Sequence, residues 1–178
     1  MKSKDILLLL KLVALEQSVN AESSEHYSVR GLEGSTGISK SELSQALKRC
    51  IDVGLVARHH RTGLPRVNRR ALLGFLREGV KYVFPTSLGP VARGIPTGFA
   101  APGLTGRLMS AGDLIPVWPD AKASHMGQAV EPLSPTVPQA AVQDPRLYQM
   151  LALVDAIRLG NARESSVAVQ QLEELLAE

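Results

Sequence analysis

Residues 28–67 read SVRGLEGSTGISKSELSQALKRCIDVGLVARHHRTGLPRV, and this stretch decides the fold of the N-terminal part of the chain. Ser39 and Glu42 stand three residues apart, the spacing of a capping box in which each side chain bonds the other's free backbone N–H. Behind them, apolar residues recur at the three-and-four spacing of one buried helix face. These residues are Leu43, Ala46, Leu47, Cys50 and Ile51. The pattern predicts an amphipathic helix that starts at residue 40.

The other side of this predicted helix is polar and carries no acid. Its residues are Lys40, Ser41, Ser44, Gln45, Lys48 and Arg49. We expect Gly54 to end the helix, because glycine enters the left-handed conformation without steric cost. A strand over 55–59, a tip at 61–63 and a returning strand over 64–67 then predict a β-hairpin.

Helices are also predicted on both sides of this unit. Ser28 is a plausible N-cap for a preceding helix that contains Gly31 and Gly34, each of which costs about 1 kcal/mol relative to alanine. That helix is therefore either short or packed very closely by another element. Asn68 is the expected N-cap of a following helix over 69–78, which a glycine ends. An apolar exit strand or turn is expected over the next five residues.

The order helix, turn, helix and hairpin, with the phrase ISKSELSQALKRCIDVGLV, resembles the winged helix-turn-helix domains of the broad class that includes MarR-like transcriptional regulators. The resemblance covers residues 1–83. It implies that the second helix of the motif enters the major groove of double-stranded DNA, while the wing lies on the backbone or in the minor groove. The residues expected to contact DNA are Ser39, Lys40, Ser41, Ser44, Gln45, Lys48, Arg49, Arg58, His60, Arg61, Thr62, Arg66, Arg69 and Arg70.

Each part of this interpretation has a simpler alternative. The polar helix face is also typical of a solvated face in a winged helix that binds protein, and a charged hairpin also serves solubility. Arg69 and Arg70 would stand in the first turn of a helix, where positive charge opposes the helix dipole. A bound phosphate would resolve this conflict. Alternatively, both side chains extend into water.

The distribution of charge favours nucleic acid. The chain has 178 residues and a net charge of +3. Residues 40–81 hold ten Lys/Arg against three acids, a balance of +7, whereas residues 82–178 hold six against nine, a balance of −3. A basic segment joined to a mildly acidic remainder is typical of a nucleic-acid-binding protein whose other part has a separate role.

Several classes of site find no support in the sequence. One cysteine allows no internal disulfide and no cysteine-based metal site, and Cys50 falls on the buried helix face, where it is expected to act as a small hydrophobe. His59 and His60 are adjacent strand residues that point to opposite faces, so we expect no metal. No phosphate-binding glycine motif or catalytic triad order stands out, so neither a cofactor nor an enzyme is predicted. No apolar run reaches 18 residues, which predicts a protein that does not cross a membrane and is cytoplasmic.

Residues 84–140 differ from their surroundings in composition. Nine of the eleven prolines and seven of the fifteen glycines fall here, a density that excludes long helices. We predict an extended segment that wraps over the folded body, with one short helical or turn piece at 104–111. Its candidate groups for a ligand or partner are Arg93, Thr97, Trp118, Asp120, His125 and Glu131. A purely structural wrap is the favoured alternative.

Residues 141–178 regain helical periodicity and predict an αα-hairpin. Asp144 is the expected cap of its first helix, and Asn161 with Glu164 marks the start of its second. The predicted first helix of the chain, 4–17, is apolar nearly all round, so its outer faces need cover from this tail or from a second subunit. This reasoning predicts a homodimer held by the first helix and the tail.

The sequence therefore predicts a mainly α protein with a small β-wing. Its three parts are a winged helix-turn-helix domain over 1–83, a Pro/Gly-rich extended segment over 84–140, and the helical hairpin over 141–178. The predicted function is a sequence-specific regulator of transcription that binds double-stranded DNA. The alternative is a protein-interaction or antitoxin-like accessory subunit, which would hold a protein partner through residues 84–178.

Overall fold

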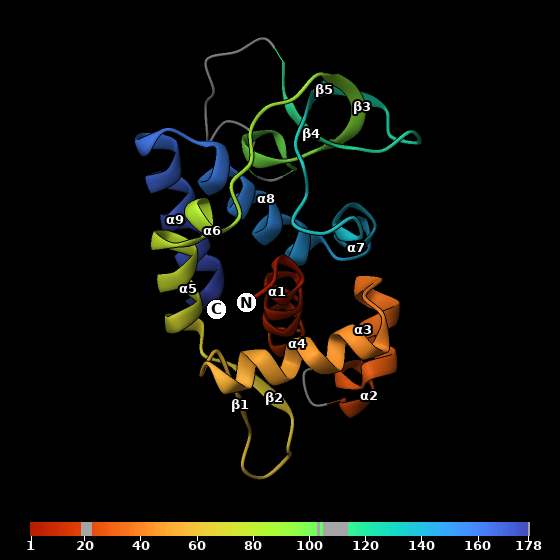
Figure 1. Ribbon diagram of the computed structural model, residues 1–178, viewed down its shortest axis with the longest axis vertical. Coiled ribbons are helices and arrows are strands. Elements are labelled where there is room, and N and C mark those ends of the chain that lie inside the picture. Colours follow the sequence, from red (N-terminus) through yellow and green to blue (C-terminus); the bar gives the residue numbers. More distant parts are fainter. Residues whose placement is uncertain (19–22, 103, 105–113, 178) are drawn as a thin grey trace.

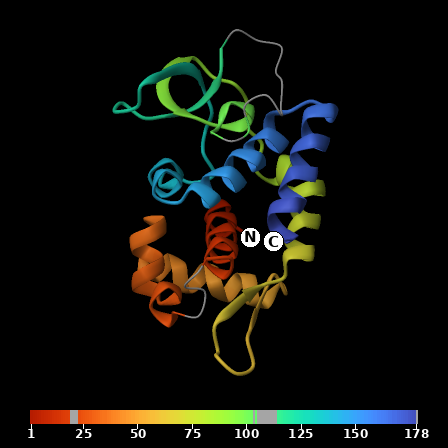
Figure 2. The same ribbon diagram turned by 180° about the vertical axis from the view of Figure 1, so that it is seen from behind.

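The computed structural model describes residues 1–18, 23–102, 104 and 114–177, and it is mainly helical with two small β-sheets. The elements in chain order are α1 (Ser3–Glu16), α2 (Ser24–Tyr27), α3 (Val29–Thr36), α4 (Lys40–Asp52), β1 (Val56–Arg58), β2 (Pro65–Val67), α5 (Arg69–Glu78), α6 (Val80–Val83), β3 (Val91–Pro96), η1 (Gly98–Ala100), β4 (Pro116–Pro119), β5 (His125–Ala129), α7 (Val137–Gln143), α8 (Pro145–Leu159) and α9 (Ala162–Ala177). The β1–β2 hairpin and the sheet β3–β4–β5 lie at opposite ends of the longest axis (Figures 1 and 2).

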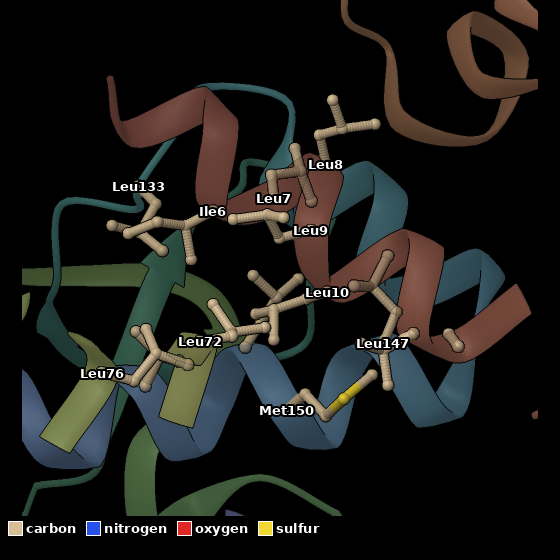
Figure 3. Packing of buried hydrophobic residues seen from close by; sticks show 14 of the residues in the cluster. Ile6, Leu7, Leu8, Leu9, Leu10, Leu72, Leu76, Leu133, Leu147 and Met150 are labelled. Atoms are coloured by element: carbon tan, nitrogen blue, oxygen red, sulfur yellow. The ribbon is translucent and has the colours of Figure 1, made fainter. Parts of the chain in front are cut away.

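Helix α1 lies at the centre of the molecule, between α4 and α8, with α5 and α9 to one side (Figures 1 and 2). Its apolar side chains from Ile6 to Leu10 are all fully buried. Figure 3 shows Leu72 and Leu76 of α5, together with Leu147 and Met150 of α8, packed in the same cluster. Of the two predicted covers for α1, the chain's own tail or a second subunit, the structure shows the tail. The apolar faces of α1 that motivated the predicted homodimer are therefore covered within one chain.

Local capping chemistry explains three helix boundaries of the N-terminal part. The Ser28 hydroxyl accepts a hydrogen bond from the Gly31 N–H at 3.0 Å, and Asn68 Oδ1 accepts one from the Ala71 N–H at 3.1 Å. Gly54 follows α4 with a φ of +75°, the left-handed conformation that glycine adopts without strain. These three predicted boundaries are confirmed.

Helix α3 is short and also closely packed, so both explanations predicted for its glycines apply. A Cβ atom on Gly31 would stand 2.4 Å from the Glu25 carbonyl oxygen of α2, whereas one on Gly34 would meet nothing within 4 Å. Residues 24–27 form a further short helix, α2, and residues 80–83 form the helix α6, where an exit strand or turn was predicted.

The middle segment has regular structure, and the prediction of an extended wrap without it was wrong. Strand β3 pairs antiparallel with both β4 and β5, and β4 pairs parallel with β5, which closes a small three-stranded barrel. Glycines permit this closure: a Cβ atom on Gly94 would stand 2.2 Å from the Trp118 carbonyl oxygen, and one on Gly127 would stand 2.1 Å from that of Ile115. The piece expected at 104–111 lies, except for Leu104, outside the described residues.

The C-terminal αα-hairpin is confirmed. Asp144 Oδ1 accepts hydrogen bonds from the N–H groups of Arg146 and Leu147, and Asn161 Oδ1 caps α9 in the same way. The ammonium group of Lys11 lies 2.8 Å from the Asp144 carboxylate, which ties α1 to the start of α8. None of the helices that the structure describes is both long and apolar enough to cross a membrane.

Candidate nucleic-acid interface

Helix α4 begins as predicted, but its first turn is stabilised differently. The Ser39 hydroxyl makes no hydrogen bond to a backbone N–H and instead donates to Glu42 Oε2 at 3.1 Å. The Glu42 carboxylate also accepts a hydrogen bond from the Lys4 ammonium group at 2.6 Å, which connects α4 to α1. The hydrogen bonds from Lys4 and then Ser39 lower the pKa of Glu42. The predicted capping box was therefore wrong in its partners.

The outward side of α4 is polar and exposed along its first nine residues. Its exposed residues, with the preceding cap, are Ser39, Lys40, Ser41, Ser44, Gln45 and Lys48. The inward side buries Leu43, Ala46 and Cys50, as the periodicity predicted. The Ser44 hydroxyl donates to the Lys40 carbonyl oxygen, whereas no described contact of the Gln45 or Lys48 side chains engages another polar group of the protein. The Gln45 and Lys48 side chains are thus available to a partner.

The β1–β2 hairpin projects from the body beside the C-terminal end of α4 (Figure 1). Its strands are antiparallel, with Ala57 opposite Arg66. The tip is held by hydrogen bonds from the Arg58 guanidinium to the Gly63 carbonyl oxygen at 3.0 Å and between the Thr62 hydroxyl and His59 Nδ1 at 3.1 Å. Four of its predicted contact residues are exposed, namely Arg58, His60, Arg61 and Thr62.

Two of the predicted DNA contacts are occupied within the fold. Arg49 donates from Nε and Nη2 to the fully buried carboxylate of Asp5, at 3.0 and 2.6 Å. Arg69 pairs with Glu16 at 3.1 Å and donates to the carbonyl oxygen of Leu176 at 2.8 Å. For Arg69, neither a bound phosphate nor extension into water was the right alternative. We therefore remove both arginines from the candidate interface.

The remaining predicted residues are divided. Arg66 is half-buried on β2, whereas Arg70 is exposed in the first turn of α5. The exposed cations of the candidate interface are thus Lys40, Lys48, Arg58, Arg61 and Arg70. They come from α4, the hairpin and α5, which are consecutive in the chain.

Cys50 is 1% exposed, and burial raises the pKa of its thiol to about 12. A thiol that stays protonated and covered has little nucleophilic character, which agrees with its predicted role as a small hydrophobe. Within the described ranges, no group of three or more His, Cys, Asp or Glu side chains is arranged to hold a metal ion.

A buried polar cluster joins the barrel to α8, and sequence reasoning missed its centre. Asp155 accepts hydrogen bonds from the Trp118 indole N–H at 2.6 Å and the Thr97 hydroxyl at 2.9 Å, and its other oxygen lies 2.6 Å from Arg158 Nη1. Burial raises the pKa of Asp155, and the Arg158 charge opposes this shift. Arg158 also donates to the Phe84 carbonyl oxygen at 2.8 Å.

Two residues of the middle segment that were predicted to contact a ligand or partner belong to this buried cluster instead. Thr97 and Trp118 are fully buried and serve the fold. Asp155 and Arg158 stand three residues apart in an otherwise apolar stretch of α8, and that pairing was the sequence signal for a buried ion pair. Arg93 and His125 lie at the exposed surface of the barrel.

No family model matches this chain, and comparison with curated proteins and with solved structures also gives no match.

Proposed function

We propose that the chain is a sequence-specific regulator of transcription that binds double-stranded DNA through a winged helix-turn-helix formed by α1, α3, α4 and the β1–β2 hairpin. Helix α4 is the recognition helix in the major groove, and the hairpin is the wing on the backbone or minor groove. In this proposal the chain is a binding protein and not an enzyme.

The observation that carries the proposal is the outward side of α4. It presents lysine, serine and glutamine side chains that are exposed, while the opposite side is anchored in the core. Glutamine pairs two-fold with adenine, lysine reaches guanine, and serine contacts either bases or phosphates. Lys40 pairs with Glu33 at 3.7 Å and the serines make local hydrogen bonds, whereas Gln45 and Lys48 have no polar partner among the described residues.

The hairpin supports the same proposal by its charge and position. Arg58 and Arg61 are exposed on an element that projects beyond the body, and Arg70 is exposed on the next helix. Cations at such positions suit the phosphate backbone or a narrow minor groove. The cations of the helix would then supply part of the base readout, and those of the hairpin and α5 would supply affinity.

The direct test is selection of bound sites from fragmented genomic DNA, followed by fluorescence anisotropy with a selected and a scrambled duplex at several salt concentrations. We expect log affinity to fall linearly with log salt, by about 0.9 per phosphate contact. Gln45→Ala and Lys48→Ala should change the preferred sequence, whereas Arg61→Ala should weaken all duplexes and reduce the slope by about 1.

Arg163→Ala is a matched control, because it removes one exposed cation from the start of α9, on a different element. It should leave both affinity and sequence preference unchanged. Binding that is flat against salt, or a preferred site that is the same in Gln45→Ala and Lys48→Ala as in the parent, would contradict the proposal.

A second candidate, a protein-interaction subunit, is favoured by one observation. Several large apolar side chains of the middle and C-terminal parts are exposed, including Leu88, Val91, Met126 and Val142. Exposed apolar groups of this kind are common singly but mark an interface when they form a patch. A chain that binds no duplex at low salt would favour this candidate.

A further inference from the structure

A cavity of about 760 Å³ lies between the barrel, η1 and α8. Its floor is apolar and includes Ile95, Phe99 and Ile115 with the ring of Tyr148. Apart from Tyr148, the polar side chains among its described lining residues come from one short stretch, residues 122–125, which leads into β5. A volume of 300–1,000 Å³ with an apolar lining and a few convergent polar groups is typical of a small-molecule site.

The floor of this cavity is held in place by hydrogen bonds. The Tyr148 hydroxyl donates to the Pro96 carbonyl oxygen at 2.6 Å, and burial raises the pKa of that phenol to about 12, so it stays neutral. The centroid of the Tyr148 ring lies 5.6 Å from the centroid of the Trp118 ring, and the Trp118 indole N–H is bound to Asp155. The part of the apolar surface that Tyr148 supplies is therefore preformed and requires little ordering on binding.

The rim has a positive character. Lys122 is exposed, and its backbone N–H is fixed by Asp120 Oδ1 at 2.7 Å, so the turn that presents it has a defined shape. Arg93 Nη1 donates to the Ala123 carbonyl oxygen at 3.2 Å, which supports the same turn from β3. Among the described lining residues no side chain is acidic, while Ser124 and His125 add polar atoms beside the lysine.

We propose that this cavity binds a small amphipathic anion, with an aromatic or branched aliphatic body on the floor and its anionic group at Lys122. The apolar floor selects the body by burial. The lysine selects the charge, because none of the described lining side chains is acidic and the nearby Asp120 carboxylate is bound to the Lys122 backbone N–H. The site is separate from the α4 face and does not depend on DNA binding.

The test uses 8-anilinonaphthalene-1-sulfonate, an aromatic anion, and N-phenyl-1-naphthylamine, its uncharged analogue, titrated into the full chain without DNA. The sequence contains one tryptophan, Trp118, so energy transfer from it reports a dye bound nearby. We expect one saturable site with energy transfer for the anion. Lys122→Ala should weaken anion binding about 3-fold or more and leave the neutral dye unchanged.

Ala123→Leu narrows the cavity and should weaken both dyes about tenfold or more. Arg163→Ala, which removes one exposed cation elsewhere, should change neither. Three results would overturn the proposal: no saturable anion binding to the folded chain, anion binding that Ala123→Leu leaves intact, or equal anion affinity with and without the Lys122 side chain. Circular dichroism of each variant confirms that it is folded.

Discussion

The two ends of the molecule differ in whether their polar side chains are exposed or buried. At the α4 and hairpin end, polar and cationic groups such as Gln45, Lys48 and Arg61 are exposed, with few partners inside the protein. At the barrel end, Asp155 and Trp118 are fully enclosed and bonded to each other. Polar groups that are buried and hydrogen-bonded within the fold contribute to stability, whereas polar groups that stay exposed are the candidates for function.

The largest effect is expected when one of the buried, hydrogen-bonded polar groups is removed. Asp155→Ala leaves the Arg158 guanidinium buried without its counter-ion, and breaking such a pair costs about 3–5 kcal/mol. Urea unfolding followed by circular dichroism should show this loss in the free energy of unfolding. DNA affinity at low temperature, where the variant remains folded, should be unchanged.

Glu173→Ala is the matched control for that variant. Glu173 pairs with Arg77 at 3.3 Å, but both side chains are about half exposed. Exposed ion pairs contribute about 0–1 kcal/mol, so this substitution should change the free energy of unfolding by no more than that. Equal losses for the two variants would show that burial does not distinguish these pairs.

Neighbouring residues of α4 allow the comparison within one helix. Arg49→Ala leaves the buried Asp5 carboxylate without its bidentate partner, and we expect a loss of about 1–3 kcal/mol, reduced by the partial exposure of Arg49. Lys48→Ala should change stability by less than about 0.5 kcal/mol and should weaken DNA binding. Both are measured by urea unfolding and by anisotropy with the selected duplex.

The opposite outcome would return Arg49 to the interface. If Arg49→Ala kept the parent stability and lowered DNA affinity as much as Lys48→Ala, the contact with Asp5 would be secondary. Arg49 would then act as the sequence first suggested, as a contact in the groove.

Local chemistry was predictable from the sequence, and long-range pairing was not. The caps at Ser28, Asn68 and Asp144 depend on neighbours within three residues, so their signals are complete in a short window. The barrel depends on β3 meeting β5 more than thirty residues later, and the same glycines that suggested broken structure permit its close strand contacts.

The candidate site divides in the same way. Helical periodicity correctly separated the exposed side of α4 from the buried side, because that pattern is contained in one helix. The sequence did not indicate the ion pairs of Arg49 and Arg69, whose partners Asp5 and Glu16 lie on α1, far earlier in the chain. A partner that is distant in sequence changes a residue's role without leaving a local signal.

A smaller predicted effect than that of Arg49→Ala concerns helix α3, where one glycine is required by packing and the other is not. Gly34 is exposed, has ordinary helical geometry, and offers open space to a Cβ atom. Gly34→Ala should therefore raise the free energy of unfolding by about 0.5–1 kcal/mol, because alanine loses less backbone freedom on folding. Gly31→Ala in the same helix should lower it, since its Cβ atom would meet backbone oxygens of α2. Thermal and urea unfolding measure both variants.

Because Gly34 lies outside the proposed DNA contacts, Gly34→Ala should leave duplex affinity unchanged, and a change in affinity would mean that α3 itself takes part in binding.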